Sequence, residues 1–149
     1  MILLTHMIFG AAIGSLVENI PLAIILSFLG HYFLDLFPHA DYSIGNLKNK
    51  IWDKALPDIL KVIMDFSLGF LVIFLFSKNH LIIYVCSIVA LIPDSSILIG
   101  MFFKNKLLSA HDYIHTVKVH FLHYKKISNL WRALTQVLAI IISVFLLRL

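Results

Sequence analysis

Histidine and aspartate recur at metal-ligand spacing in the first third of the chain. His31 and Asp35 are four residues apart and therefore share one face of a helix, and His39 and Asp41 follow shortly after. Pro38 ends the helix between the two pairs, which lets the second pair fold back over the first. Imidazoles and carboxylates together suit Zn²⁺, Fe²⁺ or Mn²⁺, and a divalent cation removes the cost of burying several carboxylates together. We predict a metal site here, with zinc ahead of iron or manganese.

Further residues of the same two types lie elsewhere in the chain, at the same end of the predicted helices. They are His6, Asp65, Asp94, His111 and His115. The interruption at Pro93 and Asp94 predicts a cavity, because non-helical backbone at membrane depth occurs only inside protein or beside water. We expect these residues to complete the metal centre, and Asp41 and Asp94 are the candidates for a catalytic base.

Structural roles compete with metal binding at several of these positions. His31 and Asp35 could form a hydrogen-bonded pair that joins two helices. His6 could be an interface histidine near the start of the chain. Asp65 could be neutralised by Lys61, one helical turn away.

The elements that must position these residues are apolar helices. The chain has 149 residues, of which 60% are hydrophobic and 13% charged, and its mean hydropathy is +0.95. A water-soluble domain needs far less apolar character for its core. About 20 apolar residues cross a membrane, and apolar runs of roughly that length cover residues 1–17, 21–37, 59–76, 81–103 and 130–149. We therefore predict an all-α polytopic membrane bundle of about five transmembrane helices, forming one domain over residues 1–149.

The polar segment 104–129 has apolar residues at helical spacing. They are Ala110, Ile114, Val117, Phe121 and Tyr124. This pattern predicts one amphipathic helix along the membrane surface. On its polar face we expect His120 and His123 to be solvated rather than metal ligands.

Basic residues are concentrated on one side of the predicted bundle. Ten of the twelve Lys and Arg residues belong to that side, and only Lys78 and Arg148 belong to the other. The positive-inside rule makes the basic side, which also carries the histidines and aspartates, cytoplasmic. The basic residues do not cluster with aromatic residues, which argues against nucleic acid as a partner and leaves membrane lipids as the expected one.

Four short motifs carry a resemblance to a known family. They are Thr5-His6, Gly30-His31-x-x-x-Asp35-x-x-Pro38-His39-x-Asp41, Ile92-Pro93-Asp94 and His111-x-x-x-His115-Thr116. At these residues the chain resembles small bacterial and archaeal inner-membrane proteins described as membrane-bound metal-dependent hydrolases. The resemblance implies a multi-helix fold in a prokaryotic inner membrane, a metal site drawn from these histidines and aspartates, and a hydrolytic activity.

The chain departs from that family at two of the motifs. Where the family often has P-D-x-D-H, this sequence reads Pro93-Asp94-Ser95-Ser96-Ile97 and lacks the second aspartate and the histidine of that motif. Where the family has H-R-x-x-T-H, this sequence reads His111-Asp112-Tyr113-Ile114-His115 and lacks an arginine that could bind phosphate.

Three functions are consistent with these residues. The first is a metal-dependent hydrolase acting on a membrane-associated substrate such as a lipid ester or phosphoester, and the sequence has no glycine-rich phosphate loop, G-x-S-x-G elbow or cysteine pair to suggest other chemistry. The second is a cation or proton transporter or sensor, although the far side offers only Glu18, Lys78 and His80 to continue a pathway. The third is a non-catalytic membrane scaffold.

Overall fold

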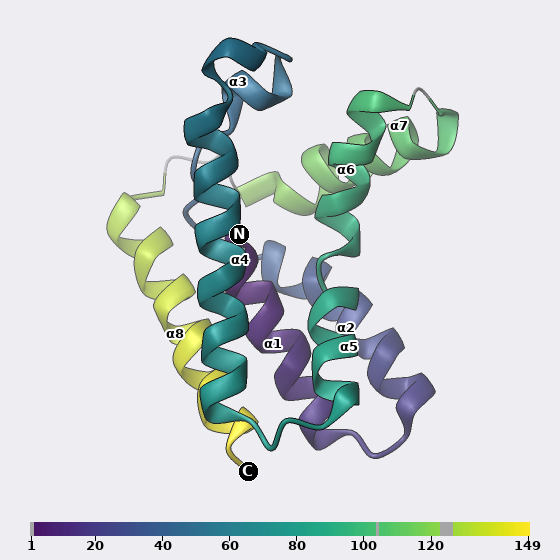
Figure 1. The fold of residues 1–149 in the computed structure, drawn as a ribbon, viewed down its shortest axis with the longest axis vertical. Helices are drawn as coiled ribbons and strands as arrows, with labels where there is room; N and C mark the ends of the chain where they lie inside the picture. Colours follow the sequence, from purple (N-terminus) through teal and green to yellow (C-terminus); the bar gives the residue numbers. More distant parts are fainter. Residues whose placement is uncertain (1, 104, 123–126) are drawn as a thin grey trace.

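The chain folds into a bundle of α-helices, shown in Figure 1. A computed structural model describes residues 2–103, 105–122 and 127–149, and no strand occurs among them. Met1, Lys104, His123 and Tyr124, which the predictions above include, lie outside the described residues. The all-α prediction is confirmed. The helices are α1 (Leu3–Leu16), α2 (Ile20–Asp35), α3 (Gly45–Lys48), η1 (Trp52–Lys54), α4 (Leu56–Phe76), α5 (Leu81–Val89), α6 (Ile92–Phe102), α7 (Lys106–Tyr113), η2 (Ile114–Lys118), η3 (Val119–Leu122) and α8 (Asn129–Leu147).

Helix α1 lies at the centre of the bundle. Helices α2, α4, α5 and α8 all pack against it (Figure 1). Its side chains Met7, Ile8 and Ala11 are fully buried and form the core with Ile73 of α4 and Ile83 of α5. Because α1 contacts four helices, most of its residues between Thr5 and Gly14 are buried.

Two glycines of α1 allow it to approach α5 closely. A Cβ atom added at Gly10 would lie 2.6 Å from the carbonyl oxygen of Cys86 and 2.7 Å from the Cβ of Ala90. A Cβ added at Gly14 would lie 2.9 Å from the Cβ of Cys86. This small-xxx-small pattern is typical of close helix packing in membranes.

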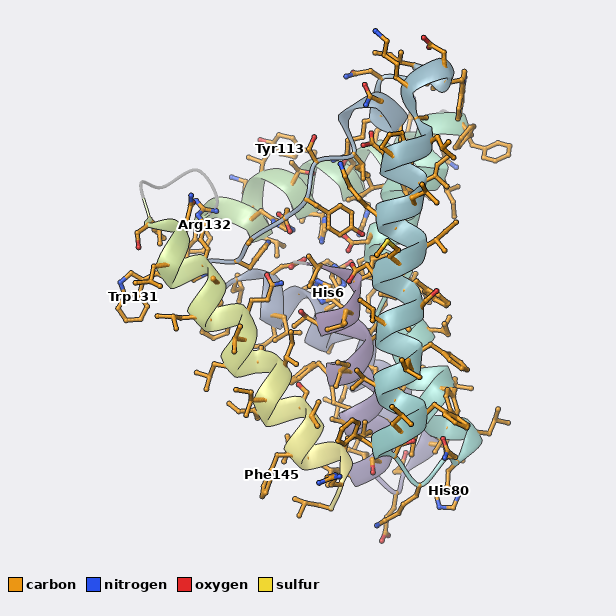
Figure 2. The ribbon with its side chains drawn as sticks, turned by 60° about the vertical axis from the view of Figure 1, so that its left-hand side comes forward. His6, His80, Tyr113, Trp131, Arg132 and Phe145 are labelled. Atoms are coloured by element: carbon orange, nitrogen blue, oxygen red, sulfur yellow. The ribbon has the colours of Figure 1, made fainter. Side chains whose placement is uncertain are left out.

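The outer faces of the bundle are apolar. Helices α4 and α8 are each long and apolar enough to cross a membrane, and α5 and α6 make a third such element if the pair is one span bent by 45°. Figure 2 shows Trp131 and Phe145 pointing outward from α8, whereas His6 lies inside the molecule. The other apolar helices, α1 and α2, have 14 and 16 residues and are shorter than a full span. The count of five transmembrane helices therefore stays a prediction.

The interruption of the fourth apolar run falls earlier than expected. Helix α5 ends at Val89 and α6 begins at Ile92, so the break lies at Ala90 and Leu91 rather than at Pro93 and Asp94. Pro93 instead occupies the first turn of α6, where its missing N–H leaves no hydrogen bond unmade. Asp94 lies in the same turn, at the positive end of the helix dipole.

The segment after α6 is not one continuous amphipathic helix. Helix α7 passes into a π-helical turn, η2, and then into a 3₁₀ turn, η3, with a kink at His120, whose ψ is 25°. Several apolar side chains of this segment are exposed, namely Leu107, Ile114, Val117 and Phe121. The predicted apolar face is therefore present, but its backbone changes from α-helix to π-helix and then to 3₁₀-helix.

We predict that Gly10→Ala destabilises the protein, by roughly 1–3 kcal/mol, because the added methyl group meets the backbone of α5. Gly100→Ala in α6 is the matched control. Its new Cβ would lie 3.7 Å from Leu108, an ordinary contact, and helix propensity favours alanine by up to about 1 kcal/mol. Thermal unfolding in detergent measures both. Equal melting temperatures for the two variants would contradict the close α1–α5 packing.

Candidate metal centre

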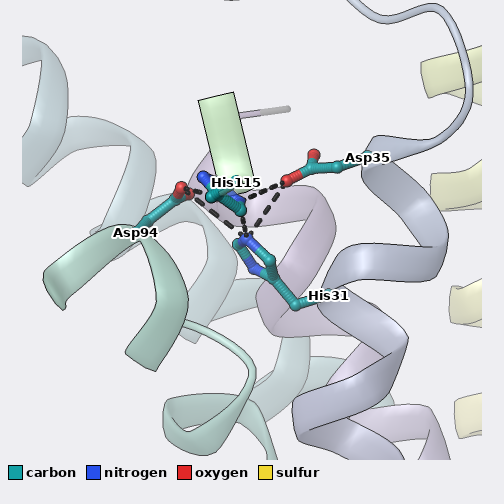
Figure 3. Close-up of side chains that lie close together, drawn as sticks. All are labelled: His31, Asp35, Asp94 and His115. Atoms are coloured by element: carbon teal, nitrogen blue, oxygen red, sulfur yellow. Dashed lines mark hydrogen bonds and ion pairs between the residues drawn. The ribbon is translucent and has the colours of Figure 1, made fainter. Parts of the chain in front are cut away.

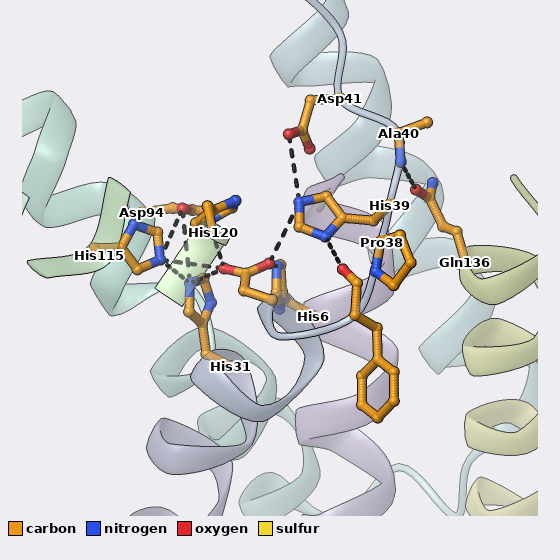
Figure 4. Close-up of polar contacts among 12 residues, drawn as sticks. His6, His31, Pro38, His39, Ala40, Asp41, Asp94, His115, His120 and Gln136 are labelled. Carbon is orange, nitrogen blue, oxygen red and sulfur yellow. Dashed lines mark hydrogen bonds and ion pairs between the residues drawn. The ribbon is translucent and has the colours of Figure 1, made fainter. Parts of the chain in front are cut away.

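Five imidazoles, those of His6, His31, His39, His115 and His120, gather at one point (Figure 4), and all five contact the carboxylate of Asp35. Asp35 is the last residue of α2 and is only 1% exposed. Its Oδ2 atom lies 3.1 Å from the Nε2 atoms of His31, His115 and His120. Its Oδ1 atom lies 3.2 Å from Nε2 of His6 and 3.8 Å from Nε2 of His39. Segments far apart in the sequence thus converge on one buried charge.

Four of the predicted residues come close enough to share one metal ion (Figure 3). His31, Asp35, Asp94 and His115 each offer one ligand atom, and these atoms all lie within 4.8 Å of one another. The Nε2 atoms of His31 and His115 are 3.0 Å apart, and Oδ1 of Asp94 lies 3.7 Å from Nε2 of His31. Two imidazoles and two carboxylates suit a divalent cation such as zinc, iron or manganese.

The bend between α5 and α6 fixes which nitrogen of His31 faces this group. Nδ1 of His31 lies 2.7 Å from the carbonyl oxygen of Ala90, which is in the break between the two helices. A carbonyl can only accept a hydrogen bond, so Nδ1 must carry the proton and donate it. In a neutral ring, Nε2 then presents its lone pair to Asp35, Asp94 and His115. Metal-binding histidines are usually oriented by such a bond.

The donor set fits a cation. With Nδ1 of His31 protonated, its Nε2 lone pair faces two carboxylates and another imidazole nitrogen, an arrangement that needs either a proton or a metal ion between them. Nδ1 of His115 and Nδ1 of His6 are also buried without a hydrogen-bond partner among the described residues. A second, adjoining set of ligand atoms, from Asp35, His39 and His120, meets the same distance criterion of 4.8 Å.

His6 contacts the centre without belonging to either set. Its ring stacks on that of His31 with 3.9 Å between centroids, and its Nε2 faces Asp35. His6 comes from the second turn of α1 and is fully buried, so it is not the interface histidine that the sequence left open. His6 therefore packs against two residues of the first ligand set, His31 and Asp35.

The sequence placed His111 in the site, but the structure uses both of its nitrogens for hydrogen bonds. Nε2 lies 2.9 Å from the hydroxyl of Tyr32, and Nδ1 lies 2.9 Å from Oγ of Ser96. Burial and the neighbouring imidazole of His115 hold the pKa of His111 below its usual value. His111 therefore ties α7 to α2 and α6 beside the metal centre, outside both ligand sets.

Asp65 also lies outside both ligand sets and binds the start of α1. Its Oδ2 accepts from the N–H of Leu3 at 2.7 Å and its Oδ1 from the N–H of Leu4 at 3.3 Å, and the hydroxyl of Tyr42 donates to Oδ2 at 3.1 Å. The first N–H groups of a helix lack partners within it, so this carboxylate acts as a cap supplied from α4. The alternative of neutralisation by Lys61 is not what forms, because the Lys61 amine pairs with Asp58 at 3.3 Å.

His120 was expected on the solvated surface and instead contacts Asp35. At 100° per residue, His115 and His120 would lie about 140° apart on an α-helix, so the sequence pattern put them on different faces. The π-helical turn between them, with i→i+5 hydrogen bonding, brings residues five apart closer to one side. Their ring centroids are 4.8 Å apart. No periodicity in the sequence signals this turn.

A cavity of about 340 Å³ opens onto the metal centre. Asp41, Asp94, His115 and His120 line it, together with apolar side chains such as Leu3, Ile44, Val62 and Leu98, and Lys48 and Tyr42. The side chain of Asp94 is 25% exposed and that of Asp41 34% exposed, so the centre can be reached from the cavity.

Asp41 stands on the cavity wall as a carboxylate. Burial by itself would raise its pKa, but the hydrogen bond and charge of His39, whose Nε2 lies 3.4 Å from Oδ2 of Asp41, hold the pKa well below its usual value. Burial and the carboxylate of Asp65 raise the pKa of nearby Tyr42, which keeps that hydroxyl protonated and able to donate.

Comparison with known proteins finds no matching family model, no matching curated protein and no matching solved structure. The family resemblance therefore rests on the short motifs alone and stays a prediction.

We predict that Asp65→Ala lowers stability and leaves metal content unchanged, because Asp65 caps α1 instead of binding metal. Leaving a buried N–H group without an acceptor costs about 1–3 kcal/mol, and these two N–H groups are partly buried, so we expect a loss at the lower end of that range. Asp53→Ala, in an exposed turn, is the matched control. Thermal unfolding and elemental analysis of the purified proteins check both quantities. Loss of metal from Asp65→Ala at an unchanged melting temperature would show that Asp65 is a ligand after all.

Proposed function

We propose that this chain is a membrane-bound metal-dependent hydrolase that acts on a membrane-associated substrate, such as a lipid ester or phosphoester. The observation that carries the proposal is the group formed by His31, Asp35, Asp94 and His115 at the floor of a cavity with partly apolar walls. A pocket with few convergent polar groups and a potential metal centre is the usual form of an active site. We propose zinc ahead of iron or manganese as the metal.

The proposed topology has five membrane-crossing elements. They are α1, α2, α4, the bent pair α5–α6, and α8, with α7, η2 and η3 at the membrane surface. The exposed apolar faces of α4 and α8 and the exposed apolar side chains of the α7–η3 segment support this arrangement. Lys48, Lys50 and Lys54 lie at the end of α4 nearer the cavity, and Lys78 lies at the other end. By the positive-inside rule the site faces the cytoplasm, in the inner membrane of a prokaryote.

The depth of the centre supports a substrate drawn from the membrane. Leu3, at the start of α1, bonds to Asp65, which is nine residues after the start of α4. At 1.5 Å per residue Asp65, and with it the start of α1, thus lies about 14 Å along that helix. The cavity that opens onto the centre is walled by Leu3, Val62 and Leu98 as well as by polar groups. A molecule that reaches the centre must tolerate both surroundings, as an amphiphile does.

The residues of the centre divide into holding and proton-transfer roles. A metal ion bound by His31, Asp35, Asp94 and His115 would polarise the scissile bond and lower the pKa of a water molecule. Asp94, within this group, is assigned to holding the ion. Asp41 is on the cavity wall outside the four-residue group, and we assign it as the general base that takes the proton of the attacking water.

The apolar core beyond the centre favours a site over a transport pathway. Met7, Ile8 and Ala11 of α1 follow His6 directly, and all are fully buried. Ile73 and Ile83 complete this layer. A cation or proton pathway would need charged groups through this region, whereas the described residues place an apolar core there, with the buried serines Ser27, Ser87 and Ser143 as its polar neighbours.

The proposal is tested with full-length protein in detergent, assayed on lipid esters and phosphoesters in mixed micelles. We expect activity that a chelator abolishes and added zinc restores. Asp41→Asn should lower kcat by about 10²-fold, the lower end of the contribution of a general base because the low pKa of Asp41 makes it a weak base, with metal content unchanged. Asp53→Asn, in an exposed turn, is the control.

Two results would count against hydrolysis. Purified protein without stoichiometric metal, together with wild-type folding of the His31→Ala, Asp35→Ala double variant, would support a scaffold. Cation flux in proteoliposomes that depends on Asp94, without hydrolysis, would support a transporter.

A further inference from the structure

The strongest unassigned feature is the second set of ligand atoms beside the first. It consists of Asp35, His39 and His120, and its atoms lie within 4.8 Å of one another. The ring centroids of His39 and His120 are 4.9 Å apart. Asp35 is the one residue that this set shares with the group of His31, Asp94 and His115.

His39 is oriented in the same way as His31. Its Nδ1 lies 2.8 Å from the carbonyl oxygen of Phe37 and must donate a proton to it, because a carbonyl only accepts. In the neutral ring, Nε2 then presents a lone pair toward the carboxylates of Asp41, at 3.4 Å, and Asp35, at 3.8 Å. A cation bound at this point would take the lone pair of His39 and lie beside both carboxylates.

The backbone of the η2–η3 segment is shaped to bring two imidazoles, not one, to Asp35. A regular helix would deliver His115 alone, since His120 would point about 140° away. The π-helical turn and the kink at His120 place Nε2 of both rings 3.1 Å from Oδ2 of Asp35. π-Helical turns are rare and are frequently found at functional sites. Such a turn at this position is understandable if His120 binds something that His115 does not.

We propose that the centre holds two divalent cations that share the carboxylate of Asp35. His31, Asp94 and His115 complete one site, and His39 and His120 complete the other. Sharing one carboxylate places the two sites side by side, as in two-metal hydrolases whose ions lie about 3.5–4 Å apart. The inference rests on the proposed function for the first metal and adds the second.

The test counts metal ions in the purified full-length chain after loading with Zn²⁺ and removal of excess. Wild type should hold two ions per chain. The double variant that combines His39→Ala with His120→Ala should hold one ion. The double variant that combines Asp94→Ala with His115→Ala should also hold one. His80→Ala, an exposed histidine at the opposite end of the molecule (Figure 2), is the matched control and should keep two.

A second measurement has its main readout on wild type, which needs no variant to fold. Wild type loaded with Mn²⁺ should give the electron paramagnetic resonance spectrum of two exchange-coupled ions, and no such coupling should appear in the variant lacking His39 and His120. Circular dichroism shows whether each variant remains folded.

The outcomes separate the two proposals. One ion per wild-type chain, kept without His39 and His120 and lost without Asp94 and His115, would overturn the second site and leave the hydrolase proposal standing. No bound ion in wild type would overturn both. Two ions in a folded variant lacking His39 and His120 would overturn the assignment of these ligands.

Discussion

The buried charge of Asp35 is the constraint on which the rest of the structure depends. A carboxylate taken out of water must be compensated by hydrogen bonds or positive charge, or its burial costs several kcal/mol. Asp35 is 1% exposed, and imidazoles from α1, α2, η2, η3 and the loop after α2 contact its carboxylate. These elements are arranged so that each brings a histidine to one of the two carboxylate oxygens of Asp35. Binding a cation would satisfy the carboxylate and the imidazole lone pairs together.

The apolar half of the bundle makes that convergence possible. Gly10 and Gly14 let α1 pack tightly against α5, and Asp65 of α4 holds the first turn of α1, so His6 is fixed in depth. The bend at Ala90 then supplies the carbonyl that orients His31. Regular packing occupies one end of the molecule, whereas the departures from regular helix gather around the metal centre. Such local irregularity is typical of functional sites, where the surrounding structure must stabilise it.

Sequence spacing could predict the parts of the site that obey helical periodicity. His31 and Asp35 are four residues apart on a regular helix, so their shared face followed from the sequence, and the all-α fold followed from the lengths of the apolar runs. The position of His120 could not be predicted, because it depends on a π-helical turn that no residue pattern encodes. The roles of Asp65 and His111 depend on partners from distant segments, Leu3 and Tyr32, that only the tertiary structure brings to them. A carboxylate that caps a helix of another segment and one that binds metal look the same in sequence.

The most direct test of this account is the X-ray absorption spectrum of the metal bound to the purified full-length chain. Histidine and aspartate ligation predicts a shell of nitrogen and oxygen atoms at about 2.0–2.2 Å with the outer-shell scattering of imidazole. No sulfur should appear at about 2.3 Å, since the chain has one cysteine, Cys86, which is buried against α1. A spectrum without imidazole scattering, or one with a sulfur ligand, would contradict the convergence of these histidines on Asp35 as a metal centre.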